Sequence, residues 1–328
     1  MLLKTFKSNR TGNFLLFPLA ALLLWLKSLI SPQAYPFYPE ESENLLFKPL
    51  HNLLAGLPLV QVILALVLFL LLAILMMQIN NRYNFLRRRS MLPAPLFIVM
   101  VSGFTGLQTL HPVWFGALFV LFSILRLFSA FNNTRAYSAA FDTGFFLAIG
   151  SLFYFNLIVL FPAFFLGIGI LTRETRWREF AVYLTGFLLP FIFAFSYLFL
   201  AGTTETFLNT MEMNIITINN HFTDNLPQKI YAGFLVFITF LGSADIIRNY
   251  DTKKVSTRKF FTVFFLIFVF SLAALIFIPA TSHEMLVIAI IPLTFLSSNF
   301  FVFMKKRFWG ELWFTLLFVF AMAMQFLN

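Results

Sequence analysis

Long apolar stretches, separated by short segments rich in arginine and lysine, constrain this chain more than any other feature. A helix needs about 20 residues to cross the hydrocarbon core of a bilayer, and fewer where the bilayer is thin. The stretches are apolar on all sides and do not alternate in polarity, which favours helices over the strands of a membrane barrel. The predicted spans are residues 13–30, 56–79, 92–110, 112–131, 138–153, 157–172, 180–200, 230–247, 260–279, 285–303 and 309–326.

The composition excludes a soluble protein. Apolar residues make up 60% of the 328 residues and charged residues only 11%, against roughly 45–50% and about 25% in soluble domains. The net charge of +10 does not indicate nucleic-acid binding, because the basic residues fall between apolar stretches and not on one soluble face. We therefore expect an all-α, polytopic transmembrane helical bundle, formed by residues 1–328 as a single integral membrane domain without a soluble domain.

The positions of arginine and lysine predict the orientation of this bundle. Basic residues stay on the cytoplasmic side of a membrane. With a cytoplasmic N-terminus, 20 of the 23 basic residues fall on that side, and only Lys27, Lys48 and Lys229 lie at or beyond the outer boundary. The 20 are Lys4, Lys7, Arg10, Arg82, Arg87, Arg88, Arg89, Arg126, Arg135, Arg173, Arg176, Arg178, Arg248, Lys253, Lys254, Arg258, Lys259, Lys305, Lys306 and Arg307. No small-residue cleavage site follows the first span, so we expect it to be retained as an anchor.

The stretch of residues 138–172 is too long for one membrane span and short for two. Arg135 before them and Arg173 after them both belong on the cytoplasmic side, so this stretch must cross an even number of times. We expect two short helices that turn near Tyr154–Asn156, which gives about eleven spans. The alternative is nine spans plus a re-entrant hairpin that never reaches the outer face, since irregular backbone survives at membrane depth when it is packed in protein.

This topology gathers most of the polar chemistry on the outer side. Seven acidic residues and all four histidines fall there. They belong to four segments, residues 31–55, 110–112, 201–229 and 279–284. The histidines are His51, His111, His221 and His283, and Glu284 follows the last. Either solvated outer loops simply contain such residues, or the bundle brings the four segments together around a shared site. In that site His111, His221, His283 and Glu284 would bind substrate.

The first outer loop holds Glu40, Glu41 and Glu43 among prolines and aromatic residues beside the membrane. A carboxylate held there could act as a general base or bind a divalent cation. Glu40 and Glu41 are therefore the candidate catalytic residues. The apolar stripe that follows is broken by Pro49 and predicts short helices lying in the interface. Its members are Leu46, Phe47, Leu50, Leu53 and Leu54.

The loop at 201–229 predicts a second interfacial helix. Its apolar residues recur at intervals of three and four, the spacing of one helix face. They are Leu208, Met211, Ile215, Ile218 and Phe222. This helix is either a lid that only packs on the bundle or a gate for a lipid-bound substrate.

Asp142 is the clearest ionisable residue inside a predicted span. Such a residue indicates function by default. Arg126 and Arg135 lie near the same boundary, so a structural ion pair is the alternative. An ion-coupled transporter usually places several ionisable groups or broken helices near the midplane, and this sequence offers almost none.

No metal site or cofactor is expected. The chain has no cysteine, and no two of its histidines are close in sequence, whereas a zinc site needs several converging ligands. The sequence contains no G-x-S-x-G elbow, P-loop or dinucleotide fingerprint.

One resemblance rests on residues 139–199. These residues include the runs FDTGFFLAIGSLFYF, FPAFFLGIGIL, TRETRWREF and GFLLPFIFAFSYLF. They resemble a family of polytopic membrane proteins of unknown function that is common in Bacteroidetes. The resemblance implies the inner membrane of a diderm bacterium but no activity. Some members are labelled carotenoid oxygenases, yet the four outer histidines do not resemble the iron site of such an enzyme.

A looser resemblance, in topology, is to GT-C type glycosyltransferases that use polyprenyl-phosphate sugars. Those enzymes have a cytoplasmic N-terminus and an acidic first outer loop with interfacial helices. The resemblance implies that Glu40 or Glu41 would serve as base or metal contact. The pair here is Glu-Glu, where the family has Asp-Glu or Glu-Asp, and large outer domains of many members are missing.

These observations lead to three functional hypotheses. In the first, a multi-pass inner-membrane protein of cell-envelope biogenesis handles a lipid-linked intermediate at the outer leaflet, with GT-C-like transfer from a polyprenyl-phosphate sugar as its chemistry. In the second, the chain is a non-enzymatic membrane subunit with protein partners in a secretion, motility or envelope complex. In the third, it is a flippase or transporter. Membrane lipids are expected partners in each case, and nucleic acid in none.

Overall fold

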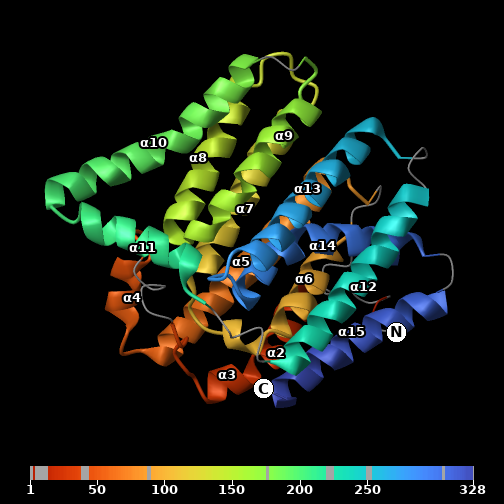
Figure 1. Cartoon of the computed structure of the whole chain (residues 1–328). Coiled ribbons are helices and arrows are strands. Elements are labelled where there is room, and N and C mark those ends of the chain that lie inside the picture. The colour runs from red at the N-terminus through yellow and green to blue at the C-terminus, as the bar shows by residue number, and fades with distance from the viewer. Residues whose placement is uncertain are drawn as a thin grey trace.

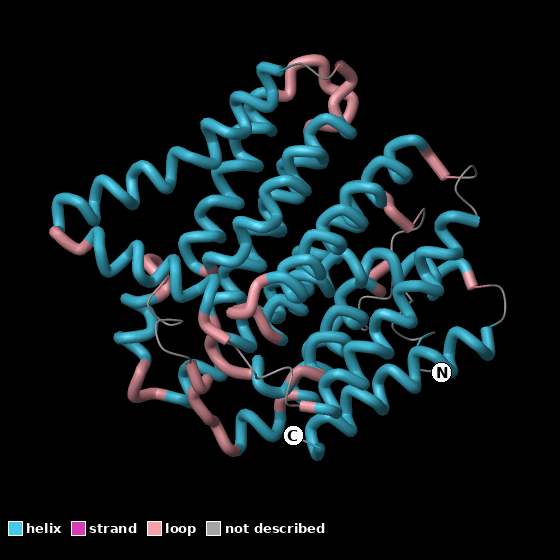
Figure 2. Tube along the Cα trace, viewed as in Figure 1, coloured by secondary structure: helices cyan, strands magenta, loops and turns pink. Residues whose placement is uncertain are grey.

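The computed structural model describes residues 3, 14–37, 44–86, 90–174, 177–218, 225–248, 253–304 and 307–327. Within these residues the chain forms fourteen α-helices, two 3-10 helices and no strand. Figures 1 and 2 show the helices packed against one another in one bundle. The predicted all-α helical bundle is confirmed.

The helices follow the predicted apolar stretches closely. Seven of them are long and apolar enough to cross a membrane, and three shorter apolar helical segments lie at Pro93–Ser102, Tyr137–Phe153 and Phe155–Leu171. The first predicted span forms two helices that meet at Trp25. The elements are α2 (Leu16–Leu24), α3 (Leu26–Ile30), α4 (Lys48–Leu54), α5 (Pro58–Tyr83), α6 (Pro93–Ser102), η3 (Thr105–Leu107), α7 (Pro112–Ser129), α8 (Tyr137–Phe153), η4 (Phe155–Leu160), α9 (Phe161–Leu171), α10 (Trp177–Ala201), α11 (Thr204–Ile216), α12 (Leu226–Arg248), α13 (Val255–Phe277), α14 (His283–Phe303) and α15 (Arg307–Leu327).

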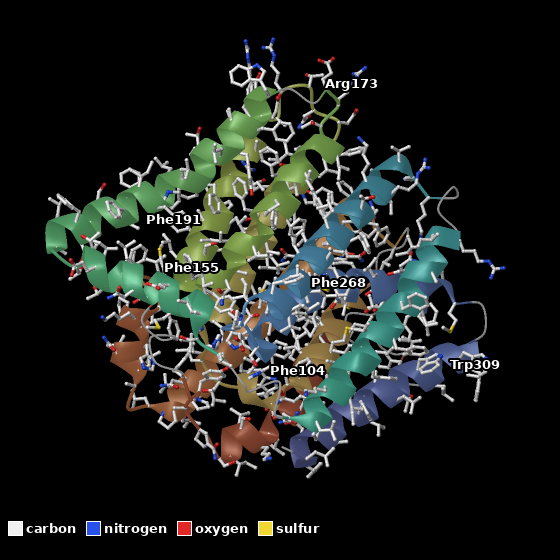
Figure 3. The ribbon with its side chains drawn as sticks, in the orientation of Figure 1. Phe104, Phe155, Arg173, Phe191, Phe268 and Trp309 are labelled. Atoms are coloured by element: carbon white, nitrogen blue, oxygen red, sulfur yellow. The ribbon has the colours of Figure 1, made fainter. Side chains whose placement is uncertain are left out.

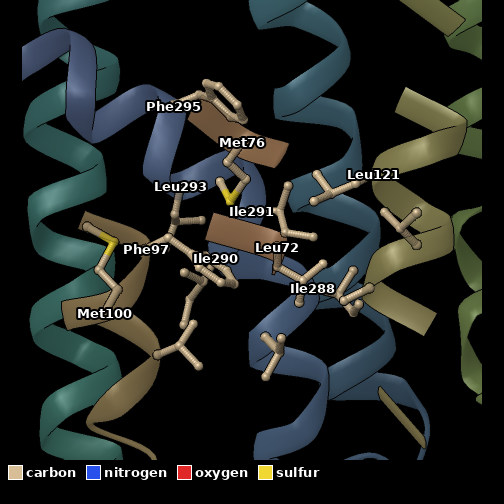
Figure 4. Packing of buried hydrophobic residues seen from close by; sticks show 14 of the residues in the cluster. Leu72, Met76, Phe97, Met100, Leu121, Ile288, Ile290, Ile291, Leu293 and Phe295 are labelled. Carbon is tan, nitrogen blue, oxygen red and sulfur yellow. The ribbon is translucent and has the colours of Figure 1, made fainter. Parts of the chain in front are cut away.

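Helix α14 forms the centre of the bundle. It packs against α6, α7, α12 and α13. Of its apolar stretch 89% is buried inside the protein, against 28% for α10. Figure 4 shows Ile290 and Ile291 of α14 in the same core as Leu72 of α5 and Phe97 of α6. Because α14 is apolar on all sides, it can be enclosed completely by other helices.

The stretch at 138–172 forms a helical hairpin, as predicted. Helix α8 ends at Phe153, and η4 and α9 return after Tyr154. The open end is tied by backbone hydrogen bonds from Asn132 N–H to the Leu171 carbonyl (3.1 Å) and from Arg173 N–H to the Asn133 carbonyl (3.2 Å). The tip is bonded to the first outer loop, because Leu46 N–H donates to the Leu152 carbonyl (3.3 Å). The tip therefore lies beside a segment predicted to be outside, which favours two crossings over a re-entrant hairpin.

Several of the described basic residues that were assigned to the cytoplasm lie at one end of the bundle, here called the basic end. The Nζ of Lys259 in α13 lies 6.0 Å from the ring centre of Phe131. Phe131 precedes Asn133 and the hairpin in the sequence. Tyr83, next to Arg82, donates its hydroxyl to the Leu125 carbonyl (3.0 Å). In Figure 3 this end carries Arg173 at the top of the view, away from Phe104 and Phe155. The side of a membrane that it faces stays a prediction.

The predicted span at 92–110 is not a continuous helix. Helix α6 ends at Ser102, and irregular backbone with the short η3 leads from Gly103 to His111. The ten residues of α6 extend about 15 Å at 1.5 Å per residue, about half of a ~30 Å hydrocarbon core. The expectation of one continuous span over residues 92–110 was therefore wrong.

The break in α6 is stabilised by side chains that satisfy its last carbonyl groups. Tyr231 of α12 donates its hydroxyl toward the carbonyls of Val99 (2.9 Å) and Met100 (3.0 Å). Gln108 Nε2 donates to the Ser102 carbonyl (3.0 Å). A side chain at Gly103 would overlap the Tyr231 ring, so only glycine fits there. These contacts satisfy the buried polar backbone, as irregular structure at membrane depth requires.

Helix α11 turns part of its predicted apolar stripe outward, and Phe222 of that stripe lies outside the described residues. Leu208 and Ile215 are 52% and 47% exposed, whereas Thr210 and Asn214 are buried. These two stripe residues therefore do not pack on the bundle, although α11 itself does, and its role as a packed lid or as a gate stays a prediction. An apolar face can point away from the protein when lipid surrounds it, because lipid is as apolar as leucine. The helix contacts α10 and η4, and its placement in the membrane interface stays a prediction.

Candidate functional site

Three histidines and their aromatic neighbours form a cluster around the N-terminus of α14, here called the histidine cluster. It consists of Tyr35, Phe37, His51, His111, Tyr154 and His283. Helix α14 has 21 residues, so at 1.5 Å per residue its two ends lie about 30 Å apart. The histidine cluster surrounds the N-terminal end. At the far end Lys253 contacts Asn299 and Phe303. The histidine cluster and the basic end therefore lie at opposite ends of the central helix.

His111 is positioned by the start of α7. It is the N-cap residue, and its Nδ1 accepts a hydrogen bond from the backbone N–H of Val113 (3.1 Å). Pro112 follows it at the first helical position, where no N–H is needed. Since Nδ1 is the acceptor, a neutral ring carries its proton on Nε2 and can donate from there. The ring is completely buried.

Aromatic rings surround His111 on several sides. The ring centre of Tyr35 lies 4.6 Å away in an edge contact, and that of Phe37 lies 5.7 Å away in a stacked one. Tyr154, at the tip of the hairpin, lies 5.9 Å away. The first outer loop and the hairpin tip therefore fix the orientation of one imidazole.

His283 and Glu284 begin the central helix. One Glu284 oxygen accepts the backbone N–H of Ser282 (2.7 Å), and the other lies 3.9 Å from His283 Nδ1. Both side chains are buried. A carboxylate in the first turn is stabilised by the helix dipole. Tyr35, with its ring centre 6.1 Å from that of His283, connects this pair to His111.

Gly106 covers His283 from the irregular segment after α6. A Cβ at this position would lie 3.1 Å from His283 Nε2. Gly106 itself is exposed, whereas His283 is 3% exposed. A side chain larger than hydrogen at position 106 would therefore press on this imidazole nitrogen.

Helix α4 brings the third histidine to the rim of the cluster. The ring of His51 lies 5.0 Å from that of Phe37 and 5.9 Å from that of Phe47, centre to centre. Phe47 is completely buried, while Leu53 on the outer side of α4 is 75% exposed. Part of the predicted interfacial stripe therefore anchors α4 to the cluster, and part faces outward.

A buried glutamine network supports the irregular segment that carries Gly106 and His111. Gln108 Nε2 donates to Gln325 Oε1 (3.2 Å), and Gln108 Oε1 accepts from Ser28 (2.7 Å). Gln325 Nε2 donates to the Ser102 carbonyl (2.7 Å). Segments near residues 28, 105 and 325 are thus bonded together beneath the site.

The structure brings together some of the predicted site residues and separates one. His111 and His283 both contact Tyr35, and Glu284 lies beside His283, whereas Glu40, Glu41 and His221 lie outside the described residues. Phe37 and Asn44, which flank the acidic segment, are both described, and Phe37 belongs to the cluster. The proposed roles of these residues stay predictions.

Asp142 is not part of this site. It forms an ion pair with Arg126, whose Nε donates to Asp142 Oδ2 (2.7 Å). Arg126 also donates to Ser138 (3.3 Å). The pair joins α7 to α8 near the basic end, which is the structural alternative considered for this residue.

Sequence reasoning missed Tyr35 and Tyr154. Tyr35 stands among the prolines of the first outer loop, and Tyr154 stands at the expected turn of the hairpin. A polar aromatic residue at each of two neighbouring outer turns was the available signal, because tyrosine often places an apolar ring with a polar tip at a site.

The chemical groups of the cluster are of the kind that could bind an anion or transfer a proton. Two imidazoles and a tyrosine provide donors beside a helix N-terminus, and Glu284 provides a carboxylate next to His283. Among the described residues, no three histidine or acidic side chains lie close enough to hold a metal ion.

The comparisons with known proteins give a family for this chain. The sequence pattern of a family of unknown function, DUF6427, matches residues 51–327. The chain belongs to the DUF6427 family. No match is found among curated proteins or solved structures. In this DUF6427 protein, His111, His283 and Glu284 lie inside the matched region, while Tyr35 and Phe37 precede it.

Proposed function

We propose that this protein handles a lipid-linked phosphate intermediate at the outer leaflet of a bacterial inner membrane, as a step in envelope biogenesis. One observation carries the proposal: His111 and His283, from segments far apart in the chain, converge on Tyr35 at the N-terminus of the central helix. Imidazole and phenol donors at a helix N-terminus suit a phosphate. The predicted outer position of this end would place it among lipid headgroups.

The lipid tail would lie beside α11. This helix presents Leu208 and Ile215 to the surroundings and turns Thr210 and Asn214 toward the protein. A lipid whose tail remains in the bilayer could follow that apolar face while its headgroup enters a more polar interior. Helix α11 would then act as a lateral gate next to η4 and the hairpin tip.

The chemistry that fits these groups is GT-C-like sugar transfer. A hydroxyl oxygen of the acceptor would attack the anomeric carbon of a polyprenyl-phosphate sugar, and the bond from that carbon to the phosphate oxygen would break. Glu40 or Glu41 would take the proton of the hydroxyl. His111 and His283 would stabilise the charge on the departing polyprenyl phosphate.

Binding of a polyprenyl monophosphate tests the central part of this proposal. The full chain in nanodiscs is titrated with the lipid. The natural chain and the His111→Ala variant are compared. Trp177→Ala, which removes an exposed ring at the basic end, is the matched control. Loss of a charged hydrogen bond of roughly 1.5–3 kcal/mol predicts binding at least about tenfold weaker for His111→Ala. Equal affinities in folded protein would exclude the cluster as the phosphate site.

The catalytic role of the first outer loop needs a separate test. Glu40→Gln and Glu41→Gln are introduced together into a deletion strain, with Glu174→Gln, at an exposed position next to Arg173 of the basic end, as the control. We expect the control to complement and the double variant to fail at normal protein levels. Full rescue by the double variant would eliminate this role for the acidic residues.

A second candidate function, a membrane subunit of an envelope, secretion or motility complex, is favoured by α10. Its apolar stretch is only 28% buried, and Figure 1 shows its Ala201 end leaning away from the other helices. Phe193 and Phe199 are 67% and 69% exposed there. Purification in mild detergent distinguishes the two: a stoichiometric protein partner supports a subunit, and a solitary protein with bound polyprenyl lipid supports the first proposal.

A third candidate, a flippase or transporter, is favoured by the break in α6, since transporters bind substrates at discontinuous helices. It predicts a water-filled path that reaches Asp142. Labelling of cysteines placed at Ser138 and Phe146 with a water-soluble maleimide tests it. Absence of labelling at both positions would reject such a path.

A further inference from the structure

A groove opens between α12 and α13 toward the basic end of the bundle. Its main part has a volume of about 530 Å³, and an adjoining part of about 210 Å³ shares Ser243, Ile247 and Phe265 with it. Both helices pack on α14, and Leu296 of α14 contributes to the lining. Two helices therefore form walls over a base provided by the central helix.

The groove is about as long as one leaflet is deep. Along α12 it extends from Val236 to Arg248, twelve positions or about 18 Å at 1.5 Å per residue. Half of a bilayer's hydrocarbon core is about 15 Å. An acyl chain with its headgroup at the Arg248 end would therefore fit along the groove.

The walls are almost entirely apolar. Phe240, Phe265 and Phe268 provide aromatic surface, and Ala244 and Ile247 provide aliphatic surface. Phe240 and Ile247 are 70% and 74% exposed, so the groove faces the surroundings of the bundle and not its interior. The hydroxyl of Thr239 is satisfied by the Leu235 carbonyl (2.8 Å) and does not demand a polar ligand.

Two arginines line the same groove at the basic end. Arg248 lies in the last turn of α12, and Arg258 lies in the first turn of α13. None of the described lining residues is acidic. Guanidinium groups match phosphate oxygens in charge and geometry, and basic pockets between membrane helices on the cytoplasmic side suit anionic headgroups.

We infer that this groove binds one anionic phospholipid of the surrounding leaflet. An acyl chain lies along the walls between α12 and α13, and the phosphate sits between Arg248 and Arg258. The site lies at the opposite end of α14 from the histidine cluster, so this inference does not depend on the proposed function.

Lipid retention by charge variants provides the first test. The full chain is purified in mild detergent from membranes that contain phosphatidylglycerol, and bound lipid is counted by native mass spectrometry. Arg248→Gln with Arg258→Gln is compared with Arg135→Gln with Arg178→Gln, which removes the same charge from exposed positions near the basic end. We expect retention to fall about tenfold or more in the first pair only, since each cation near a headgroup contributes roughly a fivefold effect. Equal retention in both pairs, or an equal loss, overturns the site.

A steric variant keeps the test valid if the charge variants fold poorly. Ala244→Trp fills the groove, and Thr185→Trp adds the same ring on exposed α10. In nanodiscs, phosphatidylglycerol should raise the unfolding temperature of the natural chain and of Thr185→Trp above that in phosphatidylcholine, but not that of Ala244→Trp. The same rise in all three overturns the inference, as does conversion of a dimer to a monomer by Ala244→Trp, which would make a second copy the occupant.

Discussion

The two ends of the bundle use polar groups in different ways. At the basic end they link segments in pairs: Arg126 of α7 binds Asp142 of α8, and Lys253, just before α13, donates to Asn299 of α14 (2.7 Å). At the other end, His111, His283 and Tyr35 come from three distant segments and meet at one centre. The contacts at the basic end each link two segments, whereas the histidine cluster gathers side chains from three distant segments around Tyr35.

This difference separates stability from function along the bundle. Substitutions at the basic end should lower the free energy of unfolding and leave ligand binding unchanged. Substitutions in the histidine cluster should weaken ligand binding and leave the free energy of unfolding nearly unchanged. Gly103 is the exception, because it ends α6 against Tyr231 and leads into the irregular segment that carries His111, so its substitution should affect both.

The largest effect is expected for Gly103→Leu. Its side chain would overlap the Tyr231 ring, and overpacking of this kind costs about 3 kcal/mol or more. Unfolding in a graded denaturing detergent should show that loss, together with weaker binding of polyprenyl phosphate. Gly233→Leu is the control, since a Cβ there meets nothing within 4 Å. Normal stability of Gly103→Leu would mean that α6 does not end against Tyr231.

His283→Ala should affect binding in particular. We expect about tenfold weaker binding of polyprenyl monophosphate, or roughly 1.4 kcal/mol, because a donor beside the helix N-terminus is lost. The unfolding temperature should remain near that of the natural chain. A large loss of stability with normal affinity would make His283 a core residue, and the comparison of the two ends would fail.

Asp142→Asn should have the opposite pattern. The pair is partly exposed, with side-chain accessibilities of 43% for Arg126 and 27% for Asp142, so the loss should be about 1 kcal/mol. A double-mutant cycle with Arg126→Gln measures the coupling directly. Polyprenyl phosphate binding should be unchanged, and a strong binding defect would bring Asp142 back as a functional residue.

The smallest effect is expected for Gly106→Ala. The new methyl group would lie 3.1 Å from His283 Nε2, so the imidazole must move by a few tenths of an ångström. We expect about threefold weaker binding, near 0.6 kcal/mol, with little change in stability. Unchanged affinity would indicate that the ligand does not use this face of His283.

The sequence was sufficient for the positions of most helices and for the grouping of the described basic residues at one end. Both features depend on neighbouring residues in the sequence. Long apolar stretches form helices, and loops rich in arginine and lysine stay on one side of a membrane. The break in α6 was not predictable, since it depends on the hydroxyl of Tyr231 reaching Val99 and Met100 from α12. No pattern within residues 92–110 contains that information.

The candidate site was predictable only in part. The histidines could be assigned to one side, but whether they meet depends on how α14 is enclosed, and a uniformly apolar helix gives no preferred face. In α11 the apolar stripe that contains Leu208 and Ile215 was recognised from its spacing of three and four residues. That spacing does not reveal whether the apolar face contacts protein or lipid. Tyr35 was missed because its neighbours His111 and His283 are distant in sequence.

Cross-linking in native membranes tests the convergence most directly. The chain has no natural cysteine, so Tyr35→Cys can be combined with His111→Cys and treated with a short bifunctional thiol reagent. The account predicts efficient intramolecular cross-linking of this pair and none for Tyr35→Cys with Arg173→Cys, which lies at the basic end. Absence of a cross-link between positions 35 and 111 in folded protein, or efficient cross-linking of the control pair, would contradict it.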